Sequence, residues 1–261
     1  MKSSKPPCNT SPVTSKIAET LLASLALLHE AALETLWPTR CVICDTPGTL
    51  LCHRCRVNLP YLDQLKACPI CGAANGIHIC TECNRFILDW KQFDSFPLEG
   101  CVSTTMLTSR TRRMVTCYKD RGEQRLASIL ASFMADVLPC SWKQEAAIVA
   151  IPTRKAAKRE RGFDHMQLLA QQLEIQTQIP LVHALSVQTR KDQRLLGGKD
   201  RLQNMTGSFT LRPNAQTELL PYRHILLIDD VMTTGATLFA AANTLRQVTK
   251  VPIYGLTFSR A

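Results

Sequence analysis

The sequence predicts an α/β fold, in which a mostly parallel sheet carries helices on both faces and a small cysteine-rich domain precedes it. Apolar runs at residues 146–151 and 225–228 have the length and composition of buried parallel strands. Helix-period apolar patterns alternate with these runs, and such alternation is typical of a parallel sheet. Four Cys-x-x-Cys pairs lie between residues 41 and 83, ahead of that pattern, so two domains are expected.

The length, composition and charge of the chain limit the classes of protein to which it can belong. Its 261 residues and 45% apolar content suffice for one α/β core with a small additional domain, and they exclude wholesale disorder. The 31 basic and 21 acidic side chains give a formal charge of +10, which favours polyanionic partners such as nucleic acid or phosphorylated metabolites. Taken alone, the charge is equally well explained by a solvated basic surface.

The N-terminal residues divide into a polar tail and a helix. Residues 1–15 are rich in Ser, Thr, Pro and Lys and are expected to be disordered. Residues 16–38 are predicted to form an amphipathic helix, because apolar residues recur three and four apart. Its uninterrupted apolar core is short and is surrounded by Glu and His, which argues against a signal peptide or a membrane span. We therefore expect a cytoplasmic protein without a membrane span, whose first helix docks on the protein itself or on a partner.

Eight cysteines form a metal-binding pattern within residues 39–85, which we predict to be a double zinc ribbon. A Cys-x-x-Cys turn directs two thiolates at one tetrahedral ion, and two such turns complete a structural Zn²⁺ site. Neighbouring pairs would give one or two sites, while a cross-braced pairing or an iron–sulfur cluster also fits the spacing. Disulfides are disfavoured because the four pairs are regular and no secretion signal is expected. The predicted ligands are Cys41, Cys44, Cys52, Cys55, Cys68, Cys71, Cys80 and Cys83.

Residues 86–100 are the expected linker, and residues 101–261 are expected to form the α/β domain. Apolar spacing predicts helices at residues 108–118, 126–137 and 166–173 and beyond residue 238, and strands at 146–151, 207–211, 225–228 and 253–258. The basic stretch after residue 151 includes Arg154 and is expected to be a loop that binds a pyrophosphate group. Residues 189–204 turn polar, as expected for a mobile flap over a substrate or for a solvated connection.

The strongest functional signal lies at residues 225–238, which predict a strand, a loop and a helix. In an open α/β sheet, ligands collect outside the carboxyl ends of the strands, where a helix N-terminus offers unpaired N–H groups to a phosphate. Asp229 and Asp230 are expected to accept hydrogen bonds from ribose hydroxyls, with Mg²⁺ balancing a pyrophosphate. The alternative to a ligand-binding site is an ordinary strand end at which an Asp caps the following helix and no ligand binds. The loop residues expected to bind the 5′-phosphate are Thr233, Thr234, Gly235, Ala236 and Thr237.

At these residues the chain resembles the type I phosphoribosyltransferase family, whose signature is two acidic residues followed by a Thr-Gly loop that binds phosphoribosyl pyrophosphate (PRPP). With its cysteine pairs, the chain also resembles the ComF/GntX family, bacterial proteins associated with competence and use of DNA. The resemblance covers about residues 33–260 and indicates the fold more strongly than the reaction. The matching stretches are Tyr-Lys-Asp-Arg-Gly at 118–122, Arg-Glu-Arg-Gly-Phe at 159–163, the flap at 193–201 with Asn204 and Phe209, and the signature at 227–238.

The resemblance also implies how PRPP would be bound. Asp229 and Asp230 would hold the ribose, residues 233–237 the 5′-phosphate, and Lys119 with Arg154 the pyrophosphate. Members of the ComF/GntX family usually continue Arg-Gly-Phe with Asn-Gln, whereas this chain has Asp-His at residues 164–165. No substrate role is therefore assigned to those two positions.

Two hypotheses about function follow from these motifs. In the first, the chain is a phosphoribosyltransferase that binds PRPP with Mg²⁺ and transfers phosphoribose to an unidentified acceptor. Thr233 stands where some purine enzymes have an Asp base, and a hydroxyl is a poor base at neutral pH, which disfavours purine salvage. In the second, a non-catalytic module keeps the PRPP pocket for sensing or architecture and binds single-stranded DNA and competence proteins. The two hypotheses are compatible.

Overall fold

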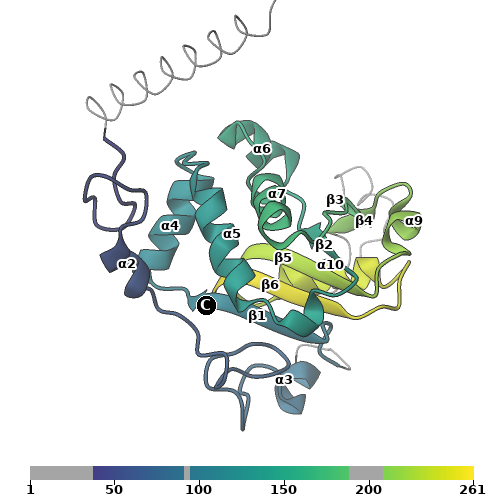
Figure 1. The fold of residues 1–261 in the computed structure, drawn as a ribbon. Coiled ribbons are helices and arrows are strands. Elements are labelled where there is room, and N and C mark those ends of the chain that lie inside the picture. Colours follow the sequence, from purple (N-terminus) through teal and green to yellow (C-terminus); the bar gives the residue numbers. More distant parts are fainter. Residues whose placement is uncertain (1–37, 91–94, 188–207) are drawn as a thin grey trace, which may run out of the picture. The chain divides into compact units, whose positions relative to one another are not determined.

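The computed structural model describes residues 38–90, 95–187 and 208–261, which are drawn in colour in Figure 1. They fall into two compact units, the first ending at His53 and the second running from Arg54 to Ala261. The expected disordered tail (1–15), the amphipathic helix (16–38, apart from Pro38) and the polar flap (189–204) lie outside the described residues. Among the described helices, none is both long and apolar enough to span a membrane.

The described part of the first unit is a tight turn around predicted metal ligands. The backbone N–H of Asp45 donates to the carbonyl of Cys41 at 2.8 Å, and the N–H of Cys41 donates to the carbonyl of Thr46 at 2.9 Å. Asp45 closes the turn with φ 65°, a left-handed conformation that Asp tolerates better than most residues. Cys41 and Cys44 are therefore held in one turn.

A four-stranded sheet forms the centre of the second unit, with the strand order β1-β6-β5-β2. Every neighbouring pair is parallel, which confirms the predicted sheet. A separate antiparallel pair is formed by β3 and β4. The strands are β1 (Gly100–Met106), β2 (Ala146–Ala150), β3 (Leu185–Val187), β4 (Phe209–Leu211), β5 (His224–Met232) and β6 (Ile253–Arg260).

Helices cover both faces of the sheet, as the sequence predicts. Helix α5 packs against β1 and β6, α7 packs against β2 and β5, and the two helices lie side by side (Figure 1). On the other face, α10 contacts β5 and β4, and its apolar side chains share a buried cluster with Val149 and Leu227. The helices are α2 (His53–Val57), α3 (Arg85–Trp90), α4 (Ser109–Lys119), α5 (Leu126–Val137), α6 (Lys155–Arg161), α7 (His165–Thr177), α9 (Ala215–Leu219) and α10 (Ala236–Leu245).

Residues 155–161 form helix α6 where the sequence analysis expected a basic loop. The segment consists of Lys, Ala, Arg and Glu, which all favour helices, so the high charge does not prevent helix formation. Gly162 ends the helix in a left-handed conformation with φ 76°. The side chains of Lys155, Lys158 and Arg159 are exposed on this helix.

Strand β5 continues to Met232, four residues beyond the end that the apolar run predicted. The reason is that β6 continues in parallel and pairs Asp229 with Thr257 and Met232 with Arg260. Asp229 and Asp230 therefore lie within the strand instead of after it. Since consecutive side chains of a strand point to opposite faces, the two carboxylates lie on different sides of the sheet.

Candidate functional site

A loop between β5 and α10 holds the predicted phosphate-binding residues. Thr233 and Thr234 are exposed, and Gly235 with φ 77° occupies the N-cap position of α10. The N–H of Ala236 lies 3.4 Å from the hydroxyl oxygen of Thr234, and the side chain of Thr237 is exposed. The N-terminus of a ten-residue helix and three hydroxyl groups thus face one short loop, an arrangement suited to an anion.

Both the packing and the backbone conformation at residue 235 require a glycine. A Cβ atom added there would lie 2.5 Å from Cζ of Phe239 and 2.8 Å from Cε of Met232. We expect Gly235→Ala to lower the free energy of unfolding by about 2 kcal/mol or more. Thermal unfolding would measure this, with Gly122→Ala as the control, because Gly122 has a similar φ of 72° and no atom within 4 Å of the added Cβ. Equal destabilisation of both variants would contradict the packing argument.

The carboxylate of Asp230 is buried on the side of the sheet that α4 and α7 cover. Its side chain is 3% exposed and forms an ion pair with Nζ of Lys119, the last residue of α4. Nε2 of His165, the first residue of α7, lies 3.6 Å from the same Oδ2 atom. Burial lowers the pKa of Lys119, and the negative charge of Asp229 opposes that shift. Asp230 is thus occupied by protein groups and holds the Lys119 ammonium in place.

Asp229 differs from Asp230 because it forms no ion pair with a cation among the described residues. The charge of Lys119, which is paired with Asp230, acts on Asp229 only at a longer distance. Its Oδ1 accepts a hydrogen bond from the backbone N–H of Asp230 at 2.9 Å. Burial raises the pKa of Asp229 to about 7, and the charge of Lys119 only partly offsets this effect. A desolvated carboxylate of this kind is suited to bind a cation or hydroxyl donors of a ligand.

His165 belongs to a polar cluster that the sequence analysis did not assign to the site. Its Nδ1 lies 3.4 Å from Oγ1 of Thr153 and 3.4 Å from Nη1 of Arg161. Burial and the charges of Lys119 and Arg161 lower the pKa of His165 to about 4, so the ring is neutral at pH 7. Asp164, the other residue of the Asp-His pair, caps α7 by accepting from the N–H of Gln167 at 3.1 Å. Both residues therefore have structural partners.

Arg154 occupies the exposed N-cap position of α6. It borders a pocket of about 360 Å³ together with Ala236 and Thr237 from the start of α10. The predicted residues thus form two groups. One group contains Asp229, Asp230 and Lys119, and the other contains Arg154 and the start of α10. The remaining residues that line the pocket are Ile151, Pro152, Val187, Ser208, Phe209 and Ala240.

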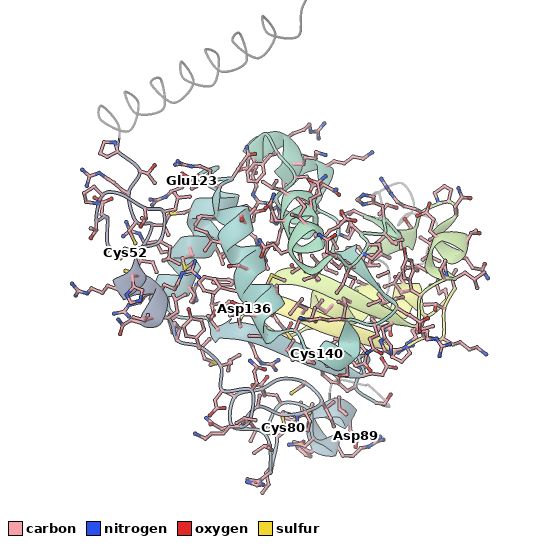
Figure 2. All side chains as sticks on the ribbon, viewed as in Figure 1. Cys52, Cys80, Asp89, Glu123, Asp136 and Cys140 are labelled. Atoms are coloured by element: carbon pink, nitrogen blue, oxygen red, sulfur yellow. The ribbon has the colours of Figure 1, made fainter. Side chains whose placement is uncertain are left out.

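The eight predicted metal ligands gather into two clusters of four, each formed by neighbouring Cys-x-x-Cys pairs. Within each cluster the sulfur atoms all lie within 4.8 Å of one another. The first cluster contains Cys41, Cys44, Cys52 and Cys55, and the second contains Cys68, Cys71, Cys80 and Cys83. Figure 2 labels one member of each, Cys52 and Cys80.

The spacing of the sulfur atoms fits tetrahedral zinc. Sγ of Cys44 and Cys52 are 3.6 Å apart, as are those of Cys68 and Cys83, and the Cys71–Cys80 distance is 3.5 Å. Four thiolates at the usual Zn–S distance would be separated by about 3.8 Å. The clusters therefore match the neighbouring-pair arrangement, and each is able to hold one ion.

No family model matches this chain. Competence protein F of Haemophilus influenzae is 28% identical over 223 residues, which cover 78% of this chain and 95% of that protein. Competence protein ComFC of Bacillus subtilis is 27% identical over 225 residues, which cover 78% of this chain and 88% of that protein.

Among solved structures, the orotate phosphoribosyltransferase from Aeropyrum pernix matches 59% of this chain and 84% of its own, with 13% identity and a TM-score of 0.34. The matches to the two competence proteins extend over most of the chain and agree with the motifs found in the sequence. The chain is therefore a homologue of competence proteins F and ComFC, in which two four-cysteine clusters accompany a parallel sheet with helices on both faces.

Proposed function

We propose that this protein binds PRPP with Mg²⁺ at the end of β5 and serves, in the cytoplasm, in competence or another use of DNA. The observation that carries the proposal is that one strand presents both Asp229, a partly buried carboxylate with no paired cation in the described part of the chain, and, four residues later, the loop at the N-terminus of α10. A carboxylate suits ribose hydroxyls, and the helix N-terminus suits the 5′-phosphate. The names of the two relatives support the link to competence.

Each group of the ligand has a matching group in the proposed site. The ribose hydroxyls donate to Asp229, while the N–H groups and hydroxyls of residues 233–237 donate to the 5′-phosphate. The exposed guanidinium of Arg154 binds the pyrophosphate. Lys119 contributes its positive charge from the opposite side of the sheet, where Asp230 fixes it. Mg²⁺ neutralises charge on the pyrophosphate when it is bound.

As an enzyme, the protein would exchange one bond at C1 of the ribose for another. The bond from C1 to the pyrophosphate oxygen breaks, a bond from C1 to the acceptor forms, and pyrophosphate leaves. The exposed Thr233 is a poor proton acceptor, so the acceptor is one that reacts without help from a base at this position. His165 is neutral, but its ring is buried between Asp230, Thr153 and Arg161, and we assign it no proton transfer.

The cysteine clusters form the proposed structural part of the protein, a double zinc ribbon at residues 39–85. Both clusters have closed sets of four thiols, which suits structural sites rather than catalytic ones. Elemental analysis of the purified chain is expected to give two zinc ions per molecule. Iron, or no metal, would refute the zinc ribbon.

Calorimetric titration of PRPP with Mg²⁺ tests the central proposal. Wild type is expected to bind with a Kd between about 1 µM and 1 mM, the range typical of enzyme substrates. The Asp229→Asn/Asp230→Asn variant is expected to give no binding heat, because it lacks the carboxylate proposed to bind the ribose and the partner that fixes Lys119. Equal affinity of the two proteins would refute the site, and binding to neither would leave the signature with a purely architectural role.

A second candidate function is direct binding of single-stranded DNA. It is favoured by the exposed basic side chains on two helices, Arg112 and Arg113 of α4 and the lysines and arginine of α6. Such binding would be dominated by phosphate contacts, so its affinity should fall steeply with salt. Fluorescence anisotropy of a labelled oligonucleotide at increasing salt would measure this, and salt-insensitive binding would count against it.

A further inference from the structure

The last residue of β6, Arg260, extends from the sheet into the second cysteine cluster. Its side chain is 3% exposed. Nη1 donates to the carbonyl oxygen of Cys71, and Nη2 forms an ion pair with Glu82, which lies between the ligands Cys80 and Cys83. Nη2 also lies 3.8 Å from Sγ of Cys71. A buried guanidinium is thus held mainly by the backbone and side chains of the cluster.

The same guanidinium reaches the end of β5, from which the phosphate-binding loop begins. Nη1 of Arg260 lies 3.3 Å from Sδ of Met232, and the two residues are paired in the sheet. Cε of Met232 lies 2.8 Å from where a Cβ on Gly235 would be. Arg260 therefore connects Cys71 through Met232 to the N-cap of α10.

A second set of contacts also connects the second cysteine cluster with the loop at Gly235. Phe96 packs against the buried side chains of the second cluster and also against the core beneath the sheet. Its ring meets that of Phe239 edge to face, with 5.0 Å between centroids. Cζ of Phe239 lies 2.5 Å from the position of a Cβ on Gly235. Two independent paths from the second cluster thus converge on the glycine of the loop.

We infer that the second cysteine cluster supports the phosphate-binding loop, and that Arg260 is the positioning residue that links them. This inference rests on the proposed function. Metal binding fixes the fold of a short cysteine-rich segment, and hence the carbonyl of Cys71 and the carboxylate of Glu82 that hold Arg260. Without the metal, Arg260 loses these partners, and Met232 and the loop lose a rigid neighbour. Metal in this cluster should therefore strengthen PRPP binding.

Coupling between two binding sites is reciprocal, so PRPP must strengthen metal retention by the same factor. The expected factor is about tenfold, within the usual range of about 5- to 150-fold for coupled sites. The zinc affinity can be measured at equilibrium, by competition with a coloured chelator in the presence and absence of PRPP and Mg²⁺. This measurement requires no turnover and no knowledge of the acceptor.

A matched pair of variants assigns the effect to one cluster. Cys44→Ser removes a ligand of the first cluster, which leaves zinc in the second, and Cys80→Ser does the opposite. We expect PRPP to raise the zinc affinity of Cys44→Ser about tenfold and to leave that of Cys80→Ser unchanged. The PRPP affinity should fall about tenfold in Cys80→Ser and stay at the wild-type value in Cys44→Ser.

Arg260 is tested in the Cys44→Ser background. Arg260→Met keeps an apolar stem of similar length and should remove the effect of PRPP on zinc affinity, whereas Arg260→Lys keeps a cation and should retain part of it. Arg223→Met is the control, since Arg223 forms an exposed ion pair with Glu145. If Arg260→Met does not fold, Phe96→Leu tests the second path in the same assay.

The outcomes separate the inference from the proposed function. PRPP binding to wild type with equal zinc affinities, with and without PRPP, would overturn the coupling and leave the function intact. An equal effect of PRPP on both clusters would also overturn it, because the contacts described lie at the second cluster. Absence of PRPP binding to wild type would overturn the function and the coupling together.

Discussion

Replacing Asp229 with asparagine is expected to weaken PRPP binding on the order of 100-fold at pH 8, while it makes the fold more stable. Hydrogen bonds to a charged group contribute about 1.5–3 kcal/mol each, and the ribose can donate more than one to this carboxylate. Asp229 has no paired cation among the described residues, and burial raises its pKa to about 7. An amide in its place removes the cost of burying a charge, which should raise the free energy of unfolding by about 1 kcal/mol.

The matched control, Asp230→Asn, is expected to lower the stability of the fold and to leave most of the PRPP affinity in place. It leaves the ammonium of Lys119, whose side chain is 23% exposed, without its partner. Breaking a fully buried pair costs about 3–5 kcal/mol, so about 2 kcal/mol of destabilisation is expected for this partly exposed one. Calorimetry and thermal unfolding of both variants would distinguish the two roles. Equal loss of stability and of affinity in both variants would contradict the division between Asp229 and Asp230.

The carboxyl group of Asp229 makes the stability of the fold and the affinity for PRPP depend on pH in opposite directions. The pKa of Asp229 is raised in the folded state, so the folded protein binds more protons than the unfolded chain between about pH 4 and pH 7. Its contribution to stability is therefore present at pH 4 and is lost as the pH rises through about 7. PRPP affinity, which needs the ionised form, should rise over the same interval. Asp229→Asn should lose the part of each pH dependence that centres on about pH 7.

The sequence predicted the carboxylates and the loop but not the division of roles between Asp229 and Asp230. The apolar run ends at Ile228, and nothing local indicates that the strand continues to Met232. That extension depends on pairing with β6, which is more than 20 residues away and continues to Arg260. The face of the sheet on which each carboxylate lies is therefore a tertiary property. The same is true of Lys119, whose partner was not predictable from its own helix.

Strand β1 was missed for a different physical reason. Its centre is polar, Ser103-Thr104-Thr105, and a periodic apolar pattern is absent. Each hydroxyl is nevertheless buried and bonded: that of Ser103 with the hydroxyl of Thr257 at 2.7 Å, and that of Thr105 with the carbonyl of Phe258 at 3.1 Å. Hydroxyls that find partners on neighbouring strands can be buried at low cost, but those partners are unknown until the sheet is assembled.

The cysteine clusters, by contrast, were predictable in detail because their information is local. A Cys-x-x-Cys pair occupies one turn, and two neighbouring pairs need only a short connection to meet. The buried Arg260 beside the second cluster was not predictable, since 189 residues separate it from Cys71. A lone arginine near the end of an apolar run gives no signal of its partner. Local motifs thus predicted the two clusters of four cysteines, and only the structure connects the second cluster to the loop.

Removal of zinc is expected to unfold the second cysteine segment while the sheet stays folded. Binding of a structural zinc supplies about 10–16 kcal/mol in small cysteine domains, far more than the few apolar contacts of such a segment can provide. In the intact fold, the N–H of Cys68 donates to the carbonyl of Ala73, and the N–H of Gly72 donates to that of Cys68, both at 2.9 Å. After chelation, exchange of these two amide hydrogens should accelerate on the order of 100-fold or more.

Hydrogen exchange with and without chelator would measure this, with the amide of Ile151 as an internal control. That amide donates to the carbonyl of Ile228 at 3.0 Å in the core of the sheet and should be unaffected. Loss of protection there would mean that the metal supports the whole domain. The amide of Ala261, which donates to the carbonyl of Met232 at 2.9 Å, is the most informative of all. It lies next to Arg260, so faster exchange at Ala261 together with unchanged exchange at Ile151 would place the effect of the metal at the strand end from which the predicted phosphate-binding loop begins.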